Sequence, residues 1–420
     1  MMKVGGSIAA IRIATIVLRF GLTIFITSQL GLEAMGQFGL ILGLGVLAPA
    51  LLGLGLNFTL AHAVVGASPA LQYDIFRQRR GFALVLLFTV SAIGIPAALA
   101  FTDLTPWQIG LVALVVWGEV LGADAYIMLT IMHANVLANI SIAIRSALWI
   151  PVAMALGFLD PAFRNLETIL LCWIAGQLVN VALVYTVIGR RLQGELPATV
   201  EPRWVARNMR SSLRIWPSDI ALVLISMGDR FVLAGTVSAV DLGIFVFYWS
   251  FANALQTLVQ AALISPALPR LIASFRKDIH QWLHSIRKIS LLIGGLGMFV
   301  GAGIYLFVWF GHRYVPQANF PWAPIFGALI IIASIARLLG DFLSTALNSA
   351  KATSAYVGFN LAFAGMLMAA LVPAASFAGI TGAASALLVL AMVFNVMKLA
   401  ALRLIVKSRV SVMPADQETG

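Results

Sequence analysis

Residues 18–40 read LRFGLTIFITSQLGLEAMGQFGL, an apolar run that carries one arginine near its start and glycines in its second half. A helix needs about 20 mainly apolar residues to cross the hydrocarbon core of a membrane. Counted from about residue 7, the run that ends near Gly31 is long enough, and a second apolar run begins near Phe38. The stretch therefore predicts two successive membrane-spanning helices, with Arg19 near the middle of the first.

The composition of the whole chain supports this interpretation. Of 420 residues, 61% are hydrophobic and 10% are charged, and the mean hydropathy is +0.98. Soluble domains carry about 25% charged residues, so a water-soluble fold is excluded. A membrane β-barrel would show segments of alternating polarity, roughly ten residues long, which this sequence lacks. We predict an all-α polytopic membrane protein.

Counted over the whole chain, the apolar segments predict about 12 transmembrane helices, the first two of which are those just described. They lie at about 7–28, 38–62, 81–101, 107–132, 136–157, 167–189, 214–236, 243–265, 288–310, 322–346, 353–373 and 379–404. The connections between them are short, and the longest, at about 190–213, falls at the midpoint of the chain.

Basic residues gather in alternate connections, which predicts the orientation. The connections after the second, sixth, eighth and tenth spans and the two tails carry Lys3, Arg77, Arg79, Arg80, Arg190, Arg191, Arg203, Arg207, Arg210, Arg270, Arg276, Lys277, Lys351, Lys407 and Arg409. The other side carries Arg164 and Arg313. Both termini are therefore expected in the cytoplasm. The formal charge of +11 is explained by this bias, and we expect no nucleic-acid partner.

Two short matches suggest that the chain repeats itself. Leu32–Phe38 and Val240–Phe245 each place an acidic residue before a Gly-x-Phe, with the two glycines 207 positions apart. A turn at His133–Asn135 has its match at Asn348–Lys351. We therefore expect two six-helix halves, residues 1–200 and 201–420, around a central cavity. Because six is even, both halves enter the membrane in the same direction, as parallel repeats.

Charged residues inside the predicted spans are the candidate site. Four of them are arginines: Arg19, Arg145, Arg230 and Arg337. A charge at mid-bilayer costs about 2.5–3.5 kcal/mol on insertion scales, so such residues face a wet interior and meet partners there. One interpretation makes them structural ion pairs, as the four-residue spacing of Arg337 and Asp341 allows. The other has them bind phosphate oxygens, which fit the planar guanidinium fork.

Four carboxylates share these spans: Glu119, Asp124, Asp229 and Asp341. Each is a candidate either to bind a coupling proton or sodium ion or to act as the counter-ion of an arginine. No phosphate loop and no His/Cys cluster with metal-ligand spacing is present, so we expect no bound cofactor or metal. The single cysteine, Cys172, cannot form an internal disulfide.

The span 1–2 segment, with LLGLGLNFTLAH after it, and the segments LNSAKATSAYVGFN and AGITGAASALLV near the C-terminus resemble the polysaccharide transporter family. This family, which includes the O-antigen flippases, belongs to the multidrug/oligosaccharidyl-lipid/polysaccharide exporter superfamily. The likeness lies around Asn348, Lys351, Asn360, Gly379, Gly382 and Ala383.

The resemblance implies a flippase in the bacterial inner membrane, not an enzyme. Its substrate would be an undecaprenyl-pyrophosphate-linked oligosaccharide, moved from the cytoplasmic to the outer leaflet by alternating access. A cationic cavity would bind the pyrophosphate, with Arg19 and Arg230 as the best candidates and Arg145 and Arg337 after them. Membrane lipids and polysaccharide assembly proteins would be its partners.

Other functions stay open from the sequence. They are a cation-coupled multidrug exporter, a peptidoglycan-precursor exporter, a membrane polysaccharide polymerase or ligase, and a scaffold without transport activity. The short outer connections, of which 311–321 (GHRYVPQANFP) is the most polar, argue against the enzyme.

Overall fold

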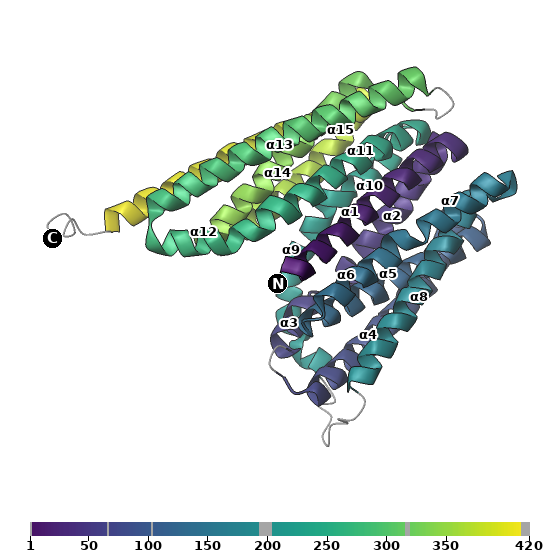
Figure 1. The fold of residues 1–420 in the computed structure, drawn as a ribbon, viewed down its shortest axis with the longest axis horizontal. Coiled ribbons are helices and arrows are strands. Elements are labelled where there is room, and N and C mark those ends of the chain that lie inside the picture. The colour runs from purple at the N-terminus through teal and green to yellow at the C-terminus, as the bar shows by residue number, and fades with distance from the viewer. Residues whose placement is uncertain (1, 65–66, 102–103, 193–203, 316–319, 413–420) are drawn as a thin grey trace. The chain divides into compact units, whose positions relative to one another are not determined.

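The computed structural model describes residues 2–64, 67–101, 104–192, 204–315 and 320–412. Every regular element in these residues is a helix (Figure 1). The chain divides into two compact units, residues 1–223 and 224–420. This division falls inside a continuous helical stretch from Trp204 to Ala234. The domain boundary expected at 200/201 lies outside the described residues.

The described helices of unit 1 are α1 Met2–Phe25, η1 Ile26–Leu30, α2 Leu32–Gly53, α3 Leu56–Val64, α4 Pro69–Phe101, α5 Pro106–Ile131, α6 Asn135–Ala143, η2 Ile144–Leu148, α7 Ile150–Leu159, η3 Pro161–Phe163, α8 Leu166–Leu192 and α9 Trp204–Val223. Those of unit 2 are η4 Leu224–Gly228, α10 Asp229–Ala234, α11 Ala239–Val259, η5 Gln260–Ile264, α12 Ser265–Lys277, α13 Ile279–Tyr314, α14 Pro324–Ser349 and α15 Thr353–Val412. All the η elements are π-helical turns except η3, which is a 3₁₀ turn.

The number of long helices agrees with the predicted number of spans. Ten helices of the described chain are long and apolar enough to cross a membrane. The last of them, Ser354–Lys407, contains two helices, because Ala378 and Gly379 leave helical geometry and Gly379 has a φ of +58°. The stretch Trp204–Ala234, whose first half is polar, adds one more. The described chain therefore has twelve long helices, and the predicted fold class is confirmed.

In unit 1, α5 packs against α8 and α2, while α1 packs against α6 and α7. Glycines let polar side chains approach α5 closely. A Cβ atom at Gly118 would overlap the amide of Gln177, and one at Gly122 would lie 2.5 Å from Cδ of Arg145. The positions of Gln177 and Arg145 therefore depend on these two glycines.

The predicted second span, 38–62, is wrong as a single helix. α2 ends at Gly53, and Leu54 and Gly55 take left-handed φ angles of +47° and +70° before α3 begins. The break leaves helix-end carbonyls without intrahelical partners. Trp216 of α9 donates its indole N–H to the carbonyls of Ala50 and Leu51, at 3.1 Å each. Pro49 and the glycines allow a break in this segment, but its place depends on α9, which comes from far along the chain.

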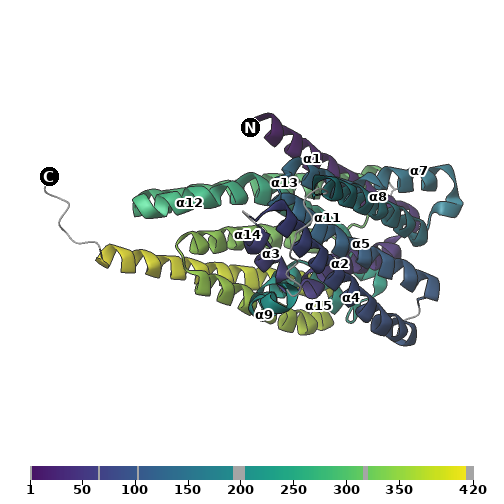
Figure 2. The same cartoon turned by 90° about the horizontal axis from the view of Figure 1, so that it is seen from below.

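In unit 2, α14 packs against α11, α13 and α15, and these helices run side by side in Figures 1 and 2. Two side chains of α15 bond to the backbone of α14. Asn395 Nδ2 donates to the carbonyl of Ala336 at 2.7 Å, and Lys398 Nζ donates to that of Gly340 at 3.1 Å. A Cβ atom at Gly340 would lie 2.6 Å from Asn395 Oδ1, so this approach requires glycine.

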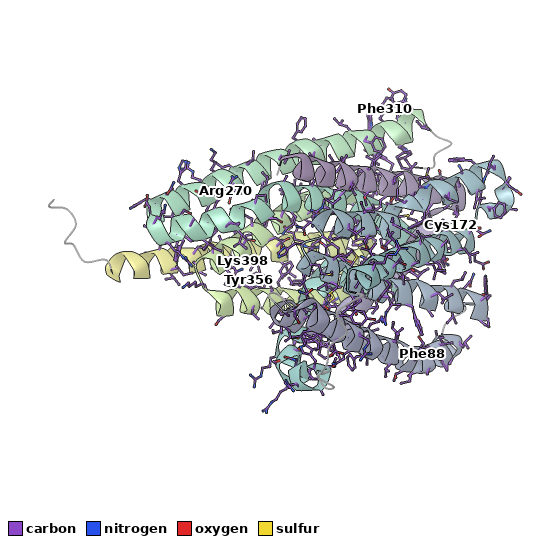
Figure 3. The ribbon with its side chains drawn as sticks, turned by 60° about the horizontal axis from the view of Figure 1, so that its bottom comes forward. Phe88, Cys172, Arg270, Phe310, Tyr356 and Lys398 are labelled. Atoms are coloured by element: carbon purple, nitrogen blue, oxygen red, sulfur yellow. The ribbon has the colours of Figure 1, made fainter. Side chains whose placement is uncertain are left out.

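The connection expected at 266–287 is helical. The helix that begins with α11 continues through α12 to Lys277, and α13 begins at Ile279. Trp282 of α13 is buried and donates its indole N–H to Ser349 Oγ of α14 at 3.0 Å. The charged residues of this hairpin, including Arg270 on α12 (Figure 3), are exposed while its apolar residues pack inward. The segment 266–287 is an amphipathic helical hairpin, and its charged face lowers the hydropathy that had indicated a connection.

Candidate functional site

The charged residues of the candidate spans fall into separate groups in the two units. In unit 1, Arg145 lies in the π-helical turn η2 and pairs with Glu119 of α5. Its Nη1 lies 3.1 Å from Glu119 Oε2 and also donates to the Glu119 carbonyl at 3.0 Å. Their side chains are 15% and 12% exposed. Arg145 is thus neutralised within its own unit.

Glu119 has further donors on α8. Its Oε1 accepts from Trp173 Nε1 at 3.2 Å and from Gln177 Nε2 at 3.1 Å. Trp149 stacks on Trp173 and donates its own indole N–H to the carbonyl of Arg145 at 3.1 Å. Both oxygens of the Glu119 carboxylate are therefore occupied by side chains of unit 1, which is the arrangement of a structural counter-ion.

Arg19 differs from Arg145 in its exposure. It lies near the middle of the candidate span Ala10–Leu30, yet its side chain is exposed. Its Nε donates to the carbonyl of Ser146, next to Arg145, over a long 3.4 Å. Glu119 and Arg145 are close enough for their charges to act on it. A mid-span guanidinium with open donors is costly against lipid, so this face of α1 must be hydrated or bound to an anion.

A second buried ion pair in unit 1 joins Arg79 of α4 to Asp124 of α5. Arg79 Nη2 lies 3.0 Å from Asp124 Oδ1, and the two side chains are 1% and 4% exposed. Arg79 Nε and Nη1 and Asp124 Oδ2 have no hydrogen-bond partner among the described residues. The assignment of Arg79 to the connection after the second span is therefore wrong, because Arg79 is a buried residue of α4. Its place in the RQRR cluster hid it, because α4 starts at Pro69 and includes the whole cluster.

In unit 2, Asp229 and Arg230 are both buried at the start of α10. Asp229 Oδ1 accepts from the backbone N–H of Arg230 at 2.9 Å. The Arg230 guanidinium directs Nη1 at Met227 Sδ, 2.8 Å away, and its Nε has no partner among the described residues. A thioether is a weak acceptor, so Arg230 has one weak side-chain contact at Nη1 and an unpartnered Nε among the described residues.

Arg337 lies at the middle of α14 and is 8% exposed. Its Cζ lies 5.6 Å from the centroid of the Trp249 ring on α11. Its Nε and Nη1 have no hydrogen-bond partner among the described residues. No ion pair within 4.0 Å joins Arg337 to Asp341 in the described chain, so the direct pair that their spacing allowed does not form.

Asp341 is exposed on α14, and the charges of Arg337 and Lys398 act on it. Asp229 in turn interacts electrostatically with Arg230 and Arg337. Lys398 of α15 is 5% exposed and lies among the helices of unit 2 (Figure 3). This buried lysine was missed in the sequence, although it interrupts the last apolar segment and could have been found there. Unit 2 thus holds three cations around two carboxylates.

No group of three or more His, Cys, Asp or Glu side chains that could hold a metal ion occurs among the described residues. Cys172, on α8 (Figure 3), is a free thiol. The arrangement of charges therefore offers two kinds of chemistry, anion binding by arginine and proton or monovalent cation binding by carboxylate.

Solved structures show what the chain is similar to. An inward-facing multidrug resistance MATE family transporter of the MOP superfamily matches with a TM-score of 0.67 and 13% identity, over 97% of this chain and 100% of that one. The chain has the fold of a MOP-superfamily transporter. The lipid II flippase MurJ, in an inward closed conformation, matches with a TM-score of 0.66 and 9% identity, over 99% and 94% of the two chains.

A MOP superfamily transporter from Pyrococcus furiosus, described as having a binding pocket of reverse polarity, matches with a TM-score of 0.54 and 12% identity, over 96% of each chain. These neighbours are transporters and a flippase, not enzymes. No protein-family model matches the chain, and no curated protein does either. The shared fold does not identify the substrate, and the charged residues inside the spans are the features that bear on it.

Proposed function

We propose that the chain is a flippase for an undecaprenyl-pyrophosphate-linked oligosaccharide, which it moves from the cytoplasmic to the outer leaflet of the bacterial inner membrane by alternating access. The observation that carries the proposal is the surplus of arginine donors in the spans. Arg145 is neutralised by Glu119 and Arg79 is paired with Asp124. Arg19, Arg230 and Arg337 have no carboxylate partner within 4.0 Å in the described chain, and each keeps donors for a ligand.

A pyrophosphate suits these donors. Arginine binds phosphate oxygens through two parallel N–H bonds, and such charge-assisted bonds are about twice as strong as neutral ones. The prenyl tail of the substrate can stay in lipid, which the exposed apolar side chains of α13, such as Phe299 and Leu291, are suited to contact. Arg19 and Arg230 stay our proposed headgroup ligands, one in each half of the repeat.

Movement is proposed to be coupled to a proton or sodium gradient. Of the four candidate carboxylates, Glu119 and Asp124 are occupied by arginines. Asp341 is exposed and has no ion pair within 4.0 Å in the described chain, so it is the better candidate for a titrating or cation-binding group. We propose that the termini lie in the cytoplasm, in line with the bias of Lys and Arg among the connections.

A multidrug exporter is the main alternative, since several structural neighbours are MATE transporters. Such a protein would bind organic cations, for which an interior with unpaired arginines is poorly suited. The two functions are separated by reconstituting the purified protein in proteoliposomes. A flippase moves a labelled lipid-linked oligosaccharide and is inactivated by Arg19→Ala or Arg230→Ala. Export of a cationic dye by a protein that does not flip the lipid-linked oligosaccharide would establish the alternative. Normal flipping by both the Arg19→Ala and the Arg230→Ala variants would refute the cationic site.

A further inference from the structure

The first turns of α13 carry basic residues that the proposed function does not use. α13 has 36 residues, or about 54 Å at about 1.5 Å per residue, whereas the hydrocarbon core of a membrane is about 30 Å thick. Its last turns carry the exposed aromatic residues Trp309 and Tyr314, a residue type that gathers at membrane interfaces. Arg287 lies 27 residues before Tyr314, about 40 Å along an upright helix, and a bilayer with its polar regions is about 40–45 Å thick. Arg287 is therefore at the level of the lipid headgroups of the opposite leaflet.

Two rows of exposed side chains run along α13 and change from basic to apolar at this level. The members of each row are four and then seven residues apart, and the rows are Arg287, Leu291 and Met298, and Lys288, Leu292 and Phe299. Residues with these spacings lie on one face of a helix. The opposite face packs on α14, where a Cβ atom at Gly297 would lie 3.0 Å from Ile335. The face of α13 that presents apolar side chains to lipid therefore continues directly into its two cations.

The neighbouring helix α12 adds a third cation at a similar level. α12 packs against α13, and the two helices meet at Asp278, which lies eight residues after Arg270 and nine before Arg287. Similar distances from the turn of a hairpin place Arg270, which is exposed (Figure 3), and Arg287 at similar heights. Asp278 is the one acidic residue between 265 and 288, and its Oδ1 accepts from the backbone N–H of His280 at 2.8 Å. Among the described residues, no carboxylate lies within 4.0 Å of Arg270, Arg287 or Lys288.

The order of charge and apolar surface matches a phospholipid better than a soluble partner. A phospholipid presents its phosphate at headgroup level and its acyl chains directly below, in the same order as the cations and the apolar side chains of α13. Basic residues beside a membrane span attract anionic lipids, and the long stems of lysine and arginine can lie along an acyl chain while the charge stays at the headgroup. An acidic soluble protein would complement the cations but not the apolar rows that continue from them.

We propose that Arg270, Arg287 and Lys288 form a binding surface for anionic phospholipids of the surrounding bilayer, with the lipid phosphate at the cations and an acyl chain along Leu291 and Leu292. The surface goes beyond the proposed function, because its ligand is a lipid of the bilayer on the exposed face of α13 and not the transported substrate. In the orientation predicted from the sequence, this lipid belongs to the cytoplasmic leaflet. Its binding holds the α12–α13 hairpin against that leaflet.

The test uses the full-length protein purified in detergent, with the dissociation constant of the first bound lipid measured by native mass spectrometry. The probes are dioleoyl phosphatidylglycerol, dioleoyl phosphatidylcholine, which has the same chains and phosphate but no net charge, and glycerol phosphate, which has no chains. We expect phosphatidylglycerol to bind most tightly and glycerol phosphate least. Arg287→Gln/Lys288→Gln should weaken phosphatidylglycerol binding about 25-fold, since each basic residue at a membrane surface contributes about fivefold. The matched control Arg403→Gln/Lys407→Gln removes two exposed cations from α15 of the same unit and should leave it unchanged.

Size-exclusion profiles establish which variants are folded, and the single variant Arg270→Gln, with an expected weakening of about fivefold, decides the result if the double variant is not. Equal affinity of the wild type for the two phospholipids would overturn the surface and leave its cations for an acidic soluble partner. Glycerol phosphate that binds as tightly as phosphatidylglycerol would show a site for free anions instead. Unchanged binding in Arg287→Gln/Lys288→Gln, or an equal loss in the α15 control, would also refute the proposal, because the hairpin would then contribute no more than its share of the total charge.

Discussion

The arginines of the spans fall into two groups: those that form an ion pair with a carboxylate and those that do not. Arg145 and Arg79 end at carboxylates of α5. Arg337 ends on an aromatic face, and Arg19 is exposed in mid-span. A buried pair costs a great deal when one member is removed, because the other charge is left behind. We therefore expect substitution of a paired arginine to lower the free energy of unfolding, and substitution of an unpaired arginine to reduce transport activity.

Glu119→Gln tests the structural role of the first pair. The amide keeps the shape and can still accept from Trp173 and Gln177, but Arg145 loses its counter-charge. We expect the free energy of unfolding to fall by about 3 kcal/mol, measured as a lower thermal midpoint in detergent. The double variant Glu119→Gln/Arg145→Met removes the stranded charge and should recover most of the loss. Equal instability of the single and double variants would show that the pair is not what matters at this position.

The second pair gives a sharper contrast, because its members are almost completely buried. Arg79→Ala strands Asp124, and we expect a loss of about 3–5 kcal/mol in unfolding free energy. Arg77, two residues away, is the matched control. Its side chain is 53% exposed and its contact with Asp74 is 3.4 Å long, so Arg77→Ala should cost under about 1 kcal/mol. If the two variants have equal thermal midpoints, the ion pair of Arg79 with Asp124 does not stabilise the packing of α4 on α5.

Among the elements, the break between α2 and α3 depends on a single glycine and on a distant helix. Gly55 has a φ of +70°, and a Cβ atom there would overlap the backbone carbonyl of Ser212 on α9. Thr59 of α3 also bonds to Ser212, with hydroxyl oxygens 2.9 Å apart. The start of the helical stretch 204–234 thus packs within unit 1, whereas the repeat predicted from the sequence assigns it to the second half.

Gly55→Ala should destabilise unit 1. The left-handed angle alone costs about 1–3 kcal/mol for a residue with a side chain, and the overlap with Ser212 adds to it. Gly81→Ala on α4 is the control with the opposite sign, because no atom lies within 4 Å of its added Cβ. Alanine in a helix interior is favoured over glycine by about 0.5–1 kcal/mol. Thermal midpoints should therefore move down for the first variant and up for the second.

The helices were predictable where hydropathy alone decides them, and the breaks and pairings were not. Apolar runs located the long helices but not all of their ends: α4 begins at Pro69 where the apolar run begins at about 81, and α13 begins at Ile279 where the run begins at about 288. The same measure merged α2 with α3, whose break depends on contacts with the distant α9. It missed α12 because an amphipathic helix with a charged face has a low mean hydropathy. Arg79 and Lys398 were misjudged or overlooked for a related reason. Whether a charge is buried depends on which helix lies opposite, and a single sequence does not contain that neighbour.

For the whole molecule, the repeat predicted from the sequence does not extend to the charged residues of the two halves. Arg19 lies 17 residues before Gly36, while Arg230 lies 13 residues before Gly243, the two glycines that the predicted repeat matches. In the predicted repeat the two arginines stand on corresponding helices but at different positions along them. Unit 1 therefore offers a mid-span arginine on its first helix, and unit 2 offers one on α14. The headgroup contacts of the proposed site are not expected to be symmetric.

The central claim is that unpaired arginines in the spans serve the movement of an anionic lipid. It is tested most directly by reconstituting wild-type protein, Arg19→Ala and the control Arg403→Ala in proteoliposomes with a fluorescent undecaprenyl-pyrophosphate-linked oligosaccharide. Quenching from outside then reports the fraction that has changed leaflet. We predict flipping by wild type and by Arg403→Ala, and a rate for Arg19→Ala that is at least about 10-fold lower, as expected for the loss of one charge-assisted contact. Equal flipping by all three proteins, or none by wild type, would contradict the account.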